Sequence, residues 1–166
     1  CVVISDITRP VPNQIILPPI LAAIEQSGIA RENITILIAT GMHRPNLGDE
    51  LESMVGRQIM EQYTIINHYC RDEDTLREIE RIDGAPIKIN THYLDADLKI
   101  LTGLIEPHFY AGFSGGRKAI LPGIASFETM KFMHSYRVID QLREANCRLE
   151  NNIFHGGEGS PLAGAW

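Results

Sequence analysis

Short, nearly continuous hydrophobic runs alternate along the chain with polar loops and with longer segments of helical spacing. Residues 2–5 and 34–39 are apolar and rich in β-branched side chains, which is typical of strands buried in a parallel sheet. The same criterion predicts strands at residues 63–68 and 98–105. Strands that alternate with helices predict right-handed βαβ units. The expected fold class is therefore α/β: a doubly wound, mostly parallel, Rossmann-like sheet with helices on both faces, in a single domain.

Three helices are expected between and after these strands. Pro18 and Pro19 fit the first turn of a helix that ends at Gly28. A second helix is expected to start at residue 46 or 49 and to run to about residue 61. Residues 126–137 have the spacing of the third helix.

The charged stretch at residues 72–81 is the hardest part to assign, because its pattern fits either a helix or a strand. It runs into the sequence DGAP at residues 83–86, which is typical of a turn, and then into an apolar run at residues 87–89. We therefore expect a β-hairpin in this region.

Polar loops follow three of the predicted strands at their carboxyl ends. One loop surrounds Arg9, one surrounds His43, and the third spans residues 106–118. In open parallel sheets, ligands bind beyond the carboxyl ends of the strands. Residues about a hundred positions apart are thus expected to share one crevice.

Composition narrows the class of protein. With 166 residues, 44% of them hydrophobic and 22% charged, the chain is long enough for one globular domain, and no run approaches the length of a membrane span. A net charge of −6 with scattered lysines and arginines argues against a nucleic-acid partner. The three cysteines, Cys1, Cys70 and Cys147, show no disulfide or zinc spacing, which favours the cytoplasm.

The chain opens within an apparent strand, so it is expected to be a fragment of a longer protein. Residues 1–152 are expected to form one domain. Residues 153–166 are rich in small residues and are expected to be a frayed end or a linker.

The stretch from residue 106 to residue 134 holds the densest candidate chemistry. Gly112, Gly115 and Gly116 lack a Cβ atom, so the backbone there can approach a bound group closely, and Lys118 follows them. A lysine in such a crevice either pairs with Glu106 or a helix end, or loses solvation and becomes a nucleophile. The spacing matches neither the Walker phosphate loop nor the dinucleotide-binding fingerprint. We therefore expect a cofactor site of another kind.

Two histidines and an arginine are candidates for substrate chemistry. His43 and His108 follow predicted strand ends, and imidazoles give and take protons near neutral pH. Arg9 suits a bidentate pair with a substrate carboxylate, or a salt bridge with Asp6. With His134, the two histidines alternatively form a three-histidine zinc site with an open position for water. The remaining histidines are expected to be structural: His68, His92 and His155.

Four features in this order resemble one family. The strings SDITRPVP, TGMHRP and EPHFYAGFSGGRKAILPG, with His134 after them, are similar to the N-terminal domain of nickel-dependent lactate racemases and their relatives, the nickel-pincer enzymes. The resemblance implies that Lys118 is joined through a thioamide to a pyridinium-derived nickel-pincer nucleotide, and that His134 is the protein ligand of its nickel. It also implies that Gly115, Gly116 and Asp6 bind the cofactor.

The resemblance further implies the activity, a racemisation or epimerisation of lactate or a similar 2-hydroxy acid. His43 and His108 look like the paired acid and base on opposite faces of the substrate carbon, and Arg9 looks like the residue that binds its carboxylate. Reversible hydride transfer from C2 then gives a 2-keto acid intermediate. The family also has a C-terminal domain and needs separate cofactor-biosynthesis enzymes, so this chain alone is expected to be inactive.

The sequence also allows two alternative functions. One is a zinc-dependent hydrolase that uses His43, His108 and His134. The other is a non-catalytic module that binds an organic anion through Arg9 and the glycine loop.

Overall fold

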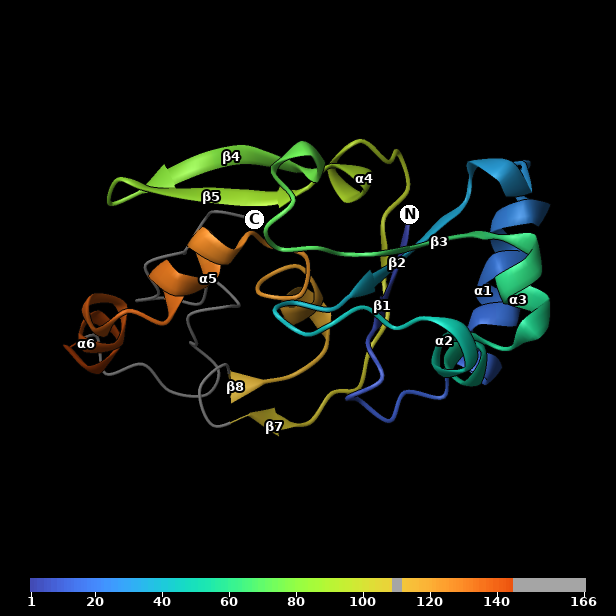
Figure 1. Cartoon of the computed structure of the whole chain (residues 1–166), viewed down its shortest axis with the longest axis horizontal. Helices are drawn as coiled ribbons and strands as arrows, with labels where there is room; N and C mark the ends of the chain where they lie inside the picture. Colours follow the sequence, from blue (N-terminus) through green and yellow to red (C-terminus); the bar gives the residue numbers. More distant parts are fainter. Residues whose placement is uncertain (109–111, 145–166) are drawn as a thin grey trace.

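A four-stranded parallel sheet lies at the centre of the computed structural model, which describes residues 1–108 and 112–144 (Figure 1). Its strands are β1 (Val2–Ser5), β2 (Thr35–Ala39), β3 (Thr64–Asn67) and β6 (Ile100–Leu101), in the order β3-β2-β1-β6. The first strand of the chain is therefore internal, with β2 on one side and β6 on the other. This arrangement confirms the predicted α/β fold with a parallel sheet.

Three helices cover one face of the sheet: α1 (Asn13–Gln26), α2 (Gly48–Val55) and α3 (Arg57–Gln62) (Figure 1). Their apolar side chains pack against alternate strand residues, because successive residues of a strand point to opposite faces. The buried residues of this layer are Val2, Ile4, Leu17, Leu21, Ile24, Ile34, Ile36, Ile38, Met54, Val55 and Ile59.

The first two predicted helices need correction. α1 begins at Asn13, so Pro18 and Pro19 lie inside the helix rather than in its first turn. The helix tolerates two missing backbone donors because Leu17 and Leu21 are fully packed against the sheet. The predicted helix over residues 46–61 is two helices, since Gly56 has a φ of +84°, which no helix can contain.

A hairpin and three helices lie on the other side of the sheet (Figure 1). The hairpin is β4 (Leu76–Ile82) with β5 (Ala85–Asn90), as the turn sequence predicts, and α4 (Thr91–Leu94) follows it. Farther along the chain come α5 (Phe127–Met133) and α6 (Tyr136–Glu144), with α6 beyond α5. Their shared core contains Val3, Leu37, Ile89, Ala119, Leu121, Ile124, Ala125, Met133 and Val138.

The helix predicted over residues 126–137 is interrupted, because α5 ends before His134 and α6 starts two residues later. Ser126 caps α5 by accepting a hydrogen bond from the Thr129 backbone N–H at 3.1 Å. The strand predicted over residues 98–105 is also shorter in the structure. Only Ile100–Leu101 pairs with β1, and the chain beyond it packs closely against a later loop: a Cβ atom on Gly103 would lie 3.3 Å from Gly115 Cα.

Short elements complete the described chain. They are the 3₁₀ turns η1 (Arg31–Asn33), η2 (Glu73–Thr75) and η3 (Gly116–Ala119), and the strand pair β7 (Pro107–His108) and β8 (Gly112–Phe113). Within the described residues, no helix is both long and apolar enough to cross a membrane. The stretch expected to be a linker, residues 153–166, lies outside the described residues, as do Cys147 and His155.

Candidate functional site

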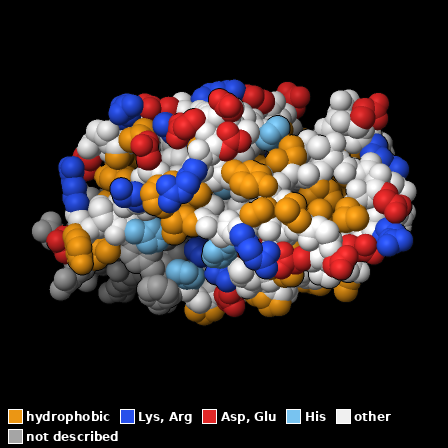
Figure 2. Space-filling model, in the orientation of Figure 1, with side chains coloured by type: hydrophobic (Ala, Val, Ile, Leu, Met, Phe, Trp, Pro, Cys, Tyr) orange, Lys and Arg blue, Asp and Glu red, His pale blue; other side chains and the backbone are white. Residues whose placement is uncertain are grey.

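The three predicted loops meet in one cavity of about 270 Å³ beyond the carboxyl ends of β1 and β2. In Figure 2, histidine side chains gather beside lysine and arginine side chains on one face of the molecule. Gly116, which was expected to contact the cofactor, does not line the cavity. The other predicted site residues all line it: Asp6, Arg9, His43, His108, Gly115, Lys118 and His134.

Asp6 and His43 form a hydrogen-bonded pair at the edge of this cavity. Asp6 follows β1, His43 follows β2, and the two strands are neighbours in parallel register. His43 Nδ1 lies 2.6 Å from Asp6 Oδ2, and the other carboxylate oxygen accepts from the Thr8 hydroxyl at 2.6 Å. Since a carboxylate only accepts, Nδ1 carries the proton and Nε2 carries the lone pair of the neutral imidazole. This tautomer is suited to a general base.

Two buried asparagines hold the Asp6 loop in place: Asn46, which the sequence marks only as a possible helix start, and Asn67, which it does not predict as a site residue. Asn46 Oδ1 accepts from the Ile7 backbone N–H at 3.3 Å. Asn67, at the end of β3, binds Asn46 in turn through its Oδ1 at 2.8 Å and its Nδ2 at 3.1 Å. The available signal was a polar side chain at the end of an apolar strand.

Lys118 lies on η3, and its side chain is half-buried in the cavity wall. Burial lowers the pKa of Lys118, and the Arg9 cation lowers it further, while Glu106 acts in the opposite direction. A lowered pKa raises the fraction of neutral amine at a given pH, and the neutral amine is the nucleophile. Lys118 is therefore suited to covalent attachment of a group.

Close backbone approaches shape the cavity around Lys118. Gly115 has a φ of +70°, and a Cβ atom there would lie 3.0 Å from the Leu104 carbonyl oxygen. Gly123 accepts from the Gly41 backbone N–H at 2.9 Å, which joins the loop after η3 to the loop of His43. A Cβ atom on Gly123 would lie 2.2 Å from the Ala119 carbonyl oxygen. Both positions therefore need glycine.

His108 enters the site from β7, a strand that the sequence did not predict. Burial lowers the pKa of His108, and the positive charges of Lys118 and Arg9 add to this effect, while Glu106 opposes it. The imidazole consequently stays neutral to a lower pH than usual, in the form that accepts a proton.

Arg9 pairs with Glu106 rather than with Asp6, the partner considered in the sequence analysis. Its Nε lies 3.8 Å from Glu106 Oε1, and both side chains are partly exposed. Exposed pairs at such distances contribute little to stability, so the guanidinium can exchange this partner for a substrate carboxylate.

His134 is placed at the C-terminal end of α5 rather than within a helix. Its Nδ1 donates to the Met130 carbonyl oxygen at 2.7 Å, which leaves Nε2 as the nitrogen that carries the lone pair in the neutral ring. A backbone carbonyl that fixes the orientation and tautomer of an imidazole is common behind metal-binding histidines.

The geometry does not support the hypothesis of a three-histidine zinc site. Within the described residues, no group of three or more His, Cys, Asp or Glu side chains lies close enough together to hold a metal ion. His43, His108 and His134 line the same cavity but do not form such a group.

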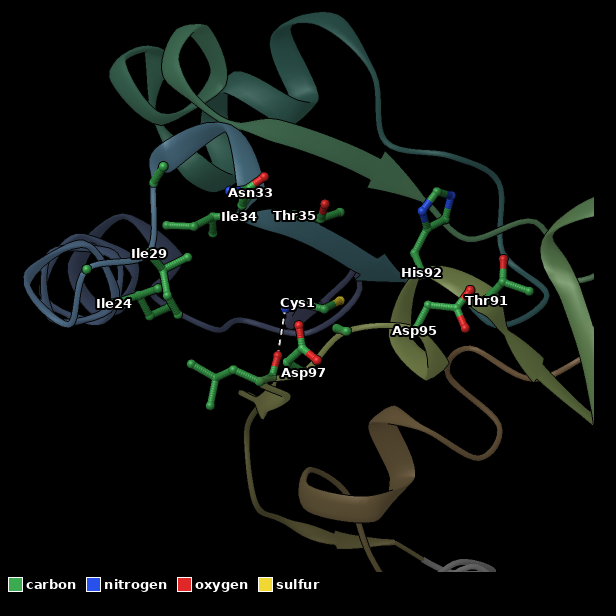
Figure 3. Close-up of a pocket in the computed structure, with 14 residues that line it drawn as sticks. Cys1, Ile24, Ile29, Asn33, Ile34, Thr35, Thr91, His92, Asp95 and Asp97 are labelled. Atoms are coloured by element: carbon green, nitrogen blue, oxygen red, sulfur yellow. Dashed lines mark hydrogen bonds between the residues drawn. The ribbon is translucent and has the colours of Figure 1, made fainter.

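A larger cleft, of about 830 Å³, opens at the opposite pole of the sheet (Figure 3). Figure 3 shows Cys1, His92, Asp95 and Asp97 around it, with Thr35 at the start of β2. This cleft lies at the amino ends of the strands, where parallel sheets rarely carry ligand sites. The smaller cavity is therefore the better candidate site.

Comparison with known protein families gives a match over most of the chain. Residues 1–146 match the family model described as the lactate racemase N-terminal domain. The lactate racemases of Lactiplantibacillus plantarum and Thermoanaerobacterium thermosaccharolyticum are 40% and 39% identical to it over 155 residues. These alignments cover 93% of this chain but 36% of each relative, so the chain spans about a third of their length.

Solved structures give the same match. The lactate racemase apoprotein from Thermoanaerobacterium thermosaccharolyticum superposes with a TM-score of 0.78 at 40% identity, over 84% of this chain and 33% of that one. A protein from Thermotoga maritima superposes with a TM-score of 0.63 at 28% identity, over 76% of this chain and 34% of that one.

Proposed function

Because the chain belongs to the lactate racemase N-terminal domain family, we propose that it is the cofactor-carrying part of a racemase or epimerase of lactate or a similar 2-hydroxy acid. One observation carries the proposal: a half-buried lysine, three histidines and an arginine from five separate segments line a single small cavity. A C-terminal domain of the same protein and cofactor-biosynthesis enzymes are its proposed partners, and the cytoplasm its proposed location.

The residues of the cavity fit a lysine-tethered nickel-pincer nucleotide. Lys118 supplies an amine of lowered pKa for the covalent link, and His134 supplies one imidazole nitrogen. Glycine at positions 115 and 123 keeps the wall free of Cβ atoms that would collide with the backbone. In this proposal the soft donors to nickel belong to the cofactor. When bound, such a group would supply reversible hydride acceptance at C2 of the substrate.

The chain's own residues bind the substrate and move its hydroxyl proton. Arg9 leaves Glu106 to bind the carboxylate, which orients C2 in the cavity. His43, held by Asp6, takes the hydroxyl proton through Nε2 when the substrate presents one face. His108 does the same for the opposite enantiomer, and its lowered pKa keeps it neutral and ready to accept. The planar 2-keto acid formed in between can be reduced on either face, which gives racemisation.

Peptide mass spectrometry across Lys118 tests the proposal in full-length protein produced with the cofactor-biosynthesis enzymes. We expect a mass addition on Lys118, bound nickel, and interconversion of pure L- and D-lactate or of another 2-hydroxy acid. Lys118→Arg, which keeps the charge but not the nucleophile, should lose all three.

Two outcomes would overturn this function. Unmodified Lys118 with stoichiometric zinc and chelator-sensitive hydrolysis would indicate the zinc-dependent hydrolase. Binding of an organic anion without turnover, unaffected by His43→Ala or His108→Ala, would indicate the non-catalytic module.

A further inference from the structure

His68 does not line the candidate site, yet its imidazole is almost completely buried beside two of the site's loops. It follows β3 directly and is 1% exposed. Buried polar side chains of this kind are normally hydrogen-bonded, and the partners show what the residue joins.

Both ring nitrogens of His68 are satisfied by other elements. Nε2 donates to the Ala125 carbonyl oxygen at 2.9 Å, and Nδ1 accepts from Asn90 Nδ2 at 3.2 Å. The Asn90 backbone N–H binds the Ile124 carbonyl oxygen at 3.0 Å, so His68 and Asn90 together hold residues 124 and 125. Burial lowers the pKa of His68, which favours the neutral ring that this network requires.

The segment that His68 holds leads directly to one residue of the site and contacts the loop of another. Ala125 precedes Ser126, the N-cap of α5, and His134 follows the last residue of α5. Two residues earlier, the Gly123 carbonyl oxygen accepts from the Gly41 N–H, two positions before His43. The backbone of His68 also faces the His43 loop, because its carbonyl oxygen accepts from the Thr40 hydroxyl.

We propose that His68 is a positioning residue: its imidazole fixes the segment of residues 123–134 against β3, and thereby sets the distance between His43 and His134. One further bond, from the Phe127 N–H to the Cys70 carbonyl oxygen at 2.7 Å, joins the same two segments. Loss of the imidazole therefore shifts the segment without detaching it. The mechanical part of this inference is that His68 holds the segment in place, and it does not depend on the proposed function. The catalytic part is that this placement affects turnover, and it rests on the proposed function.

The mechanical part is tested by amide hydrogen exchange at single-residue resolution in the full-length protein without cofactor. His68→Leu should speed up exchange of the Gly41 amide relative to wild type. This acceleration should be about tenfold larger than the acceleration of the Leu37 amide in β2. His68→Gln, whose amide N–H can reach the Ala125 carbonyl oxygen, should restore slow exchange. The control is His92→Leu, the same change at an exposed histidine of α4 in the far cleft. An equal acceleration at Gly41 and Leu37 would mean that His68 only stabilises the fold, and would overturn the proposal.

The catalytic part is tested in matured full-length enzyme. Since misplacing a reacting group by about 1 Å can cost about 10²-fold, His68→Leu should lower kcat at least about tenfold with little change in KM, and His68→Gln should recover most of kcat. A kcat within twofold of wild type overturns this part. If His68→Leu does not fold, His68→Asn replaces it, since its side chain is too short to reach Ala125. A wild-type protein that neither carries a modified Lys118 nor racemises would fail the proposed function, and the exchange result alone would then decide the role of His68.

Discussion

Asp6 and His43 lie 37 positions apart in the sequence but 2.6 Å apart in the structure, as carboxylate and imidazole. Asp6 is 4% exposed, whereas the His43 side chain is largely open to the cavity. A buried carboxylate therefore fixes the ring that would meet the substrate, an arrangement that orients a general base.

Asp6→Asn should accordingly lower kcat by about 10²–10⁴-fold with a smaller effect on KM, because an amide can donate to Nδ1 and so favours the wrong tautomer. Steady-state kinetics of the matured full-length enzyme measures this. Asp95→Asn, at an exposed carboxylate that pairs with Arg77 at the far pole, is the matched control and should be neutral. Equal kcat for Asp6→Asn and wild type would remove Asp6 from the mechanism.

Arg9→Gln should raise the pKa of both Lys118 and His108, because the Arg9 cation lowers both. His108 would then stay protonated to a higher pH, and the pH at which it becomes a base would rise. An NMR titration of the His108 ring in cofactor-free protein measures this pKa directly. Arg9→Lys keeps the charge and should leave the titration almost unchanged.

The same two variants test whether substrate binding needs the two-pronged geometry of the guanidinium rather than its charge alone. Both lose the bidentate guanidinium, so both should raise KM for the 2-hydroxy acid about 10–10²-fold, the usual loss for a charge-assisted pair. If Arg9→Lys bound substrate as tightly as wild type, the carboxylate would have another partner.

The proposed roles of His43 and His108 predict the fate of the hydrogen on C2. These residues move only the hydroxyl proton, so a substrate deuterated at C2 should keep its deuterium while it racemises in ordinary water. Mass spectrometry of the separated enantiomers measures the retained label. Exchange of the label with solvent at the rate of racemisation would instead make one of the histidines a base toward carbon.

Gly123→Ala should destabilise the chain by about 1–3 kcal/mol, because the new methyl group would lie 2.2 Å from the Ala119 carbonyl oxygen and 2.9 Å from Ala39 Cβ. Gly48→Ala, at a positive φ but in open space, should cost about 1 kcal/mol. Urea denaturation of both variants compares them. An unchanged midpoint for Gly123→Ala would show that η3 can move away.

The sequence predicts well which strands and loops form the site, because strand patterns and loop positions depend on residues that are neighbours in the chain. The apolar runs at residues 2–5 and 34–39 correctly identify β1 and β2, and the rule that ligands bind at carboxyl ends correctly brings their loops together. Lys118 and His134 also line the cavity of this site. Their chemical roles remain predictions.

What the sequence did not predict depends on contacts between distant segments. The start of α1 was placed too late, because a helix that contains two prolines forms only where Leu17 and Leu21 are packed. The partner of Arg9 and the bonds of His68 likewise depend on which loops become neighbours. A polar side chain at the end of an apolar strand, such as Asn67, does not by itself show which loop it anchors, here one that precedes it by 60 positions.

The internal position of β1 has a consequence for the order in which the molecule forms. Val2 pairs with Ile100, 98 positions later, and only this pairing brings β6 and the chain that follows it to the side of Asp6. Contacts of such long sequence separation form slowly, because a long loop must close before they become favourable. During synthesis, the pair of Asp6 and His43 can therefore assemble before Lys118 has left the ribosome, so that the proposed attachment site for the cofactor forms after that pair is in place.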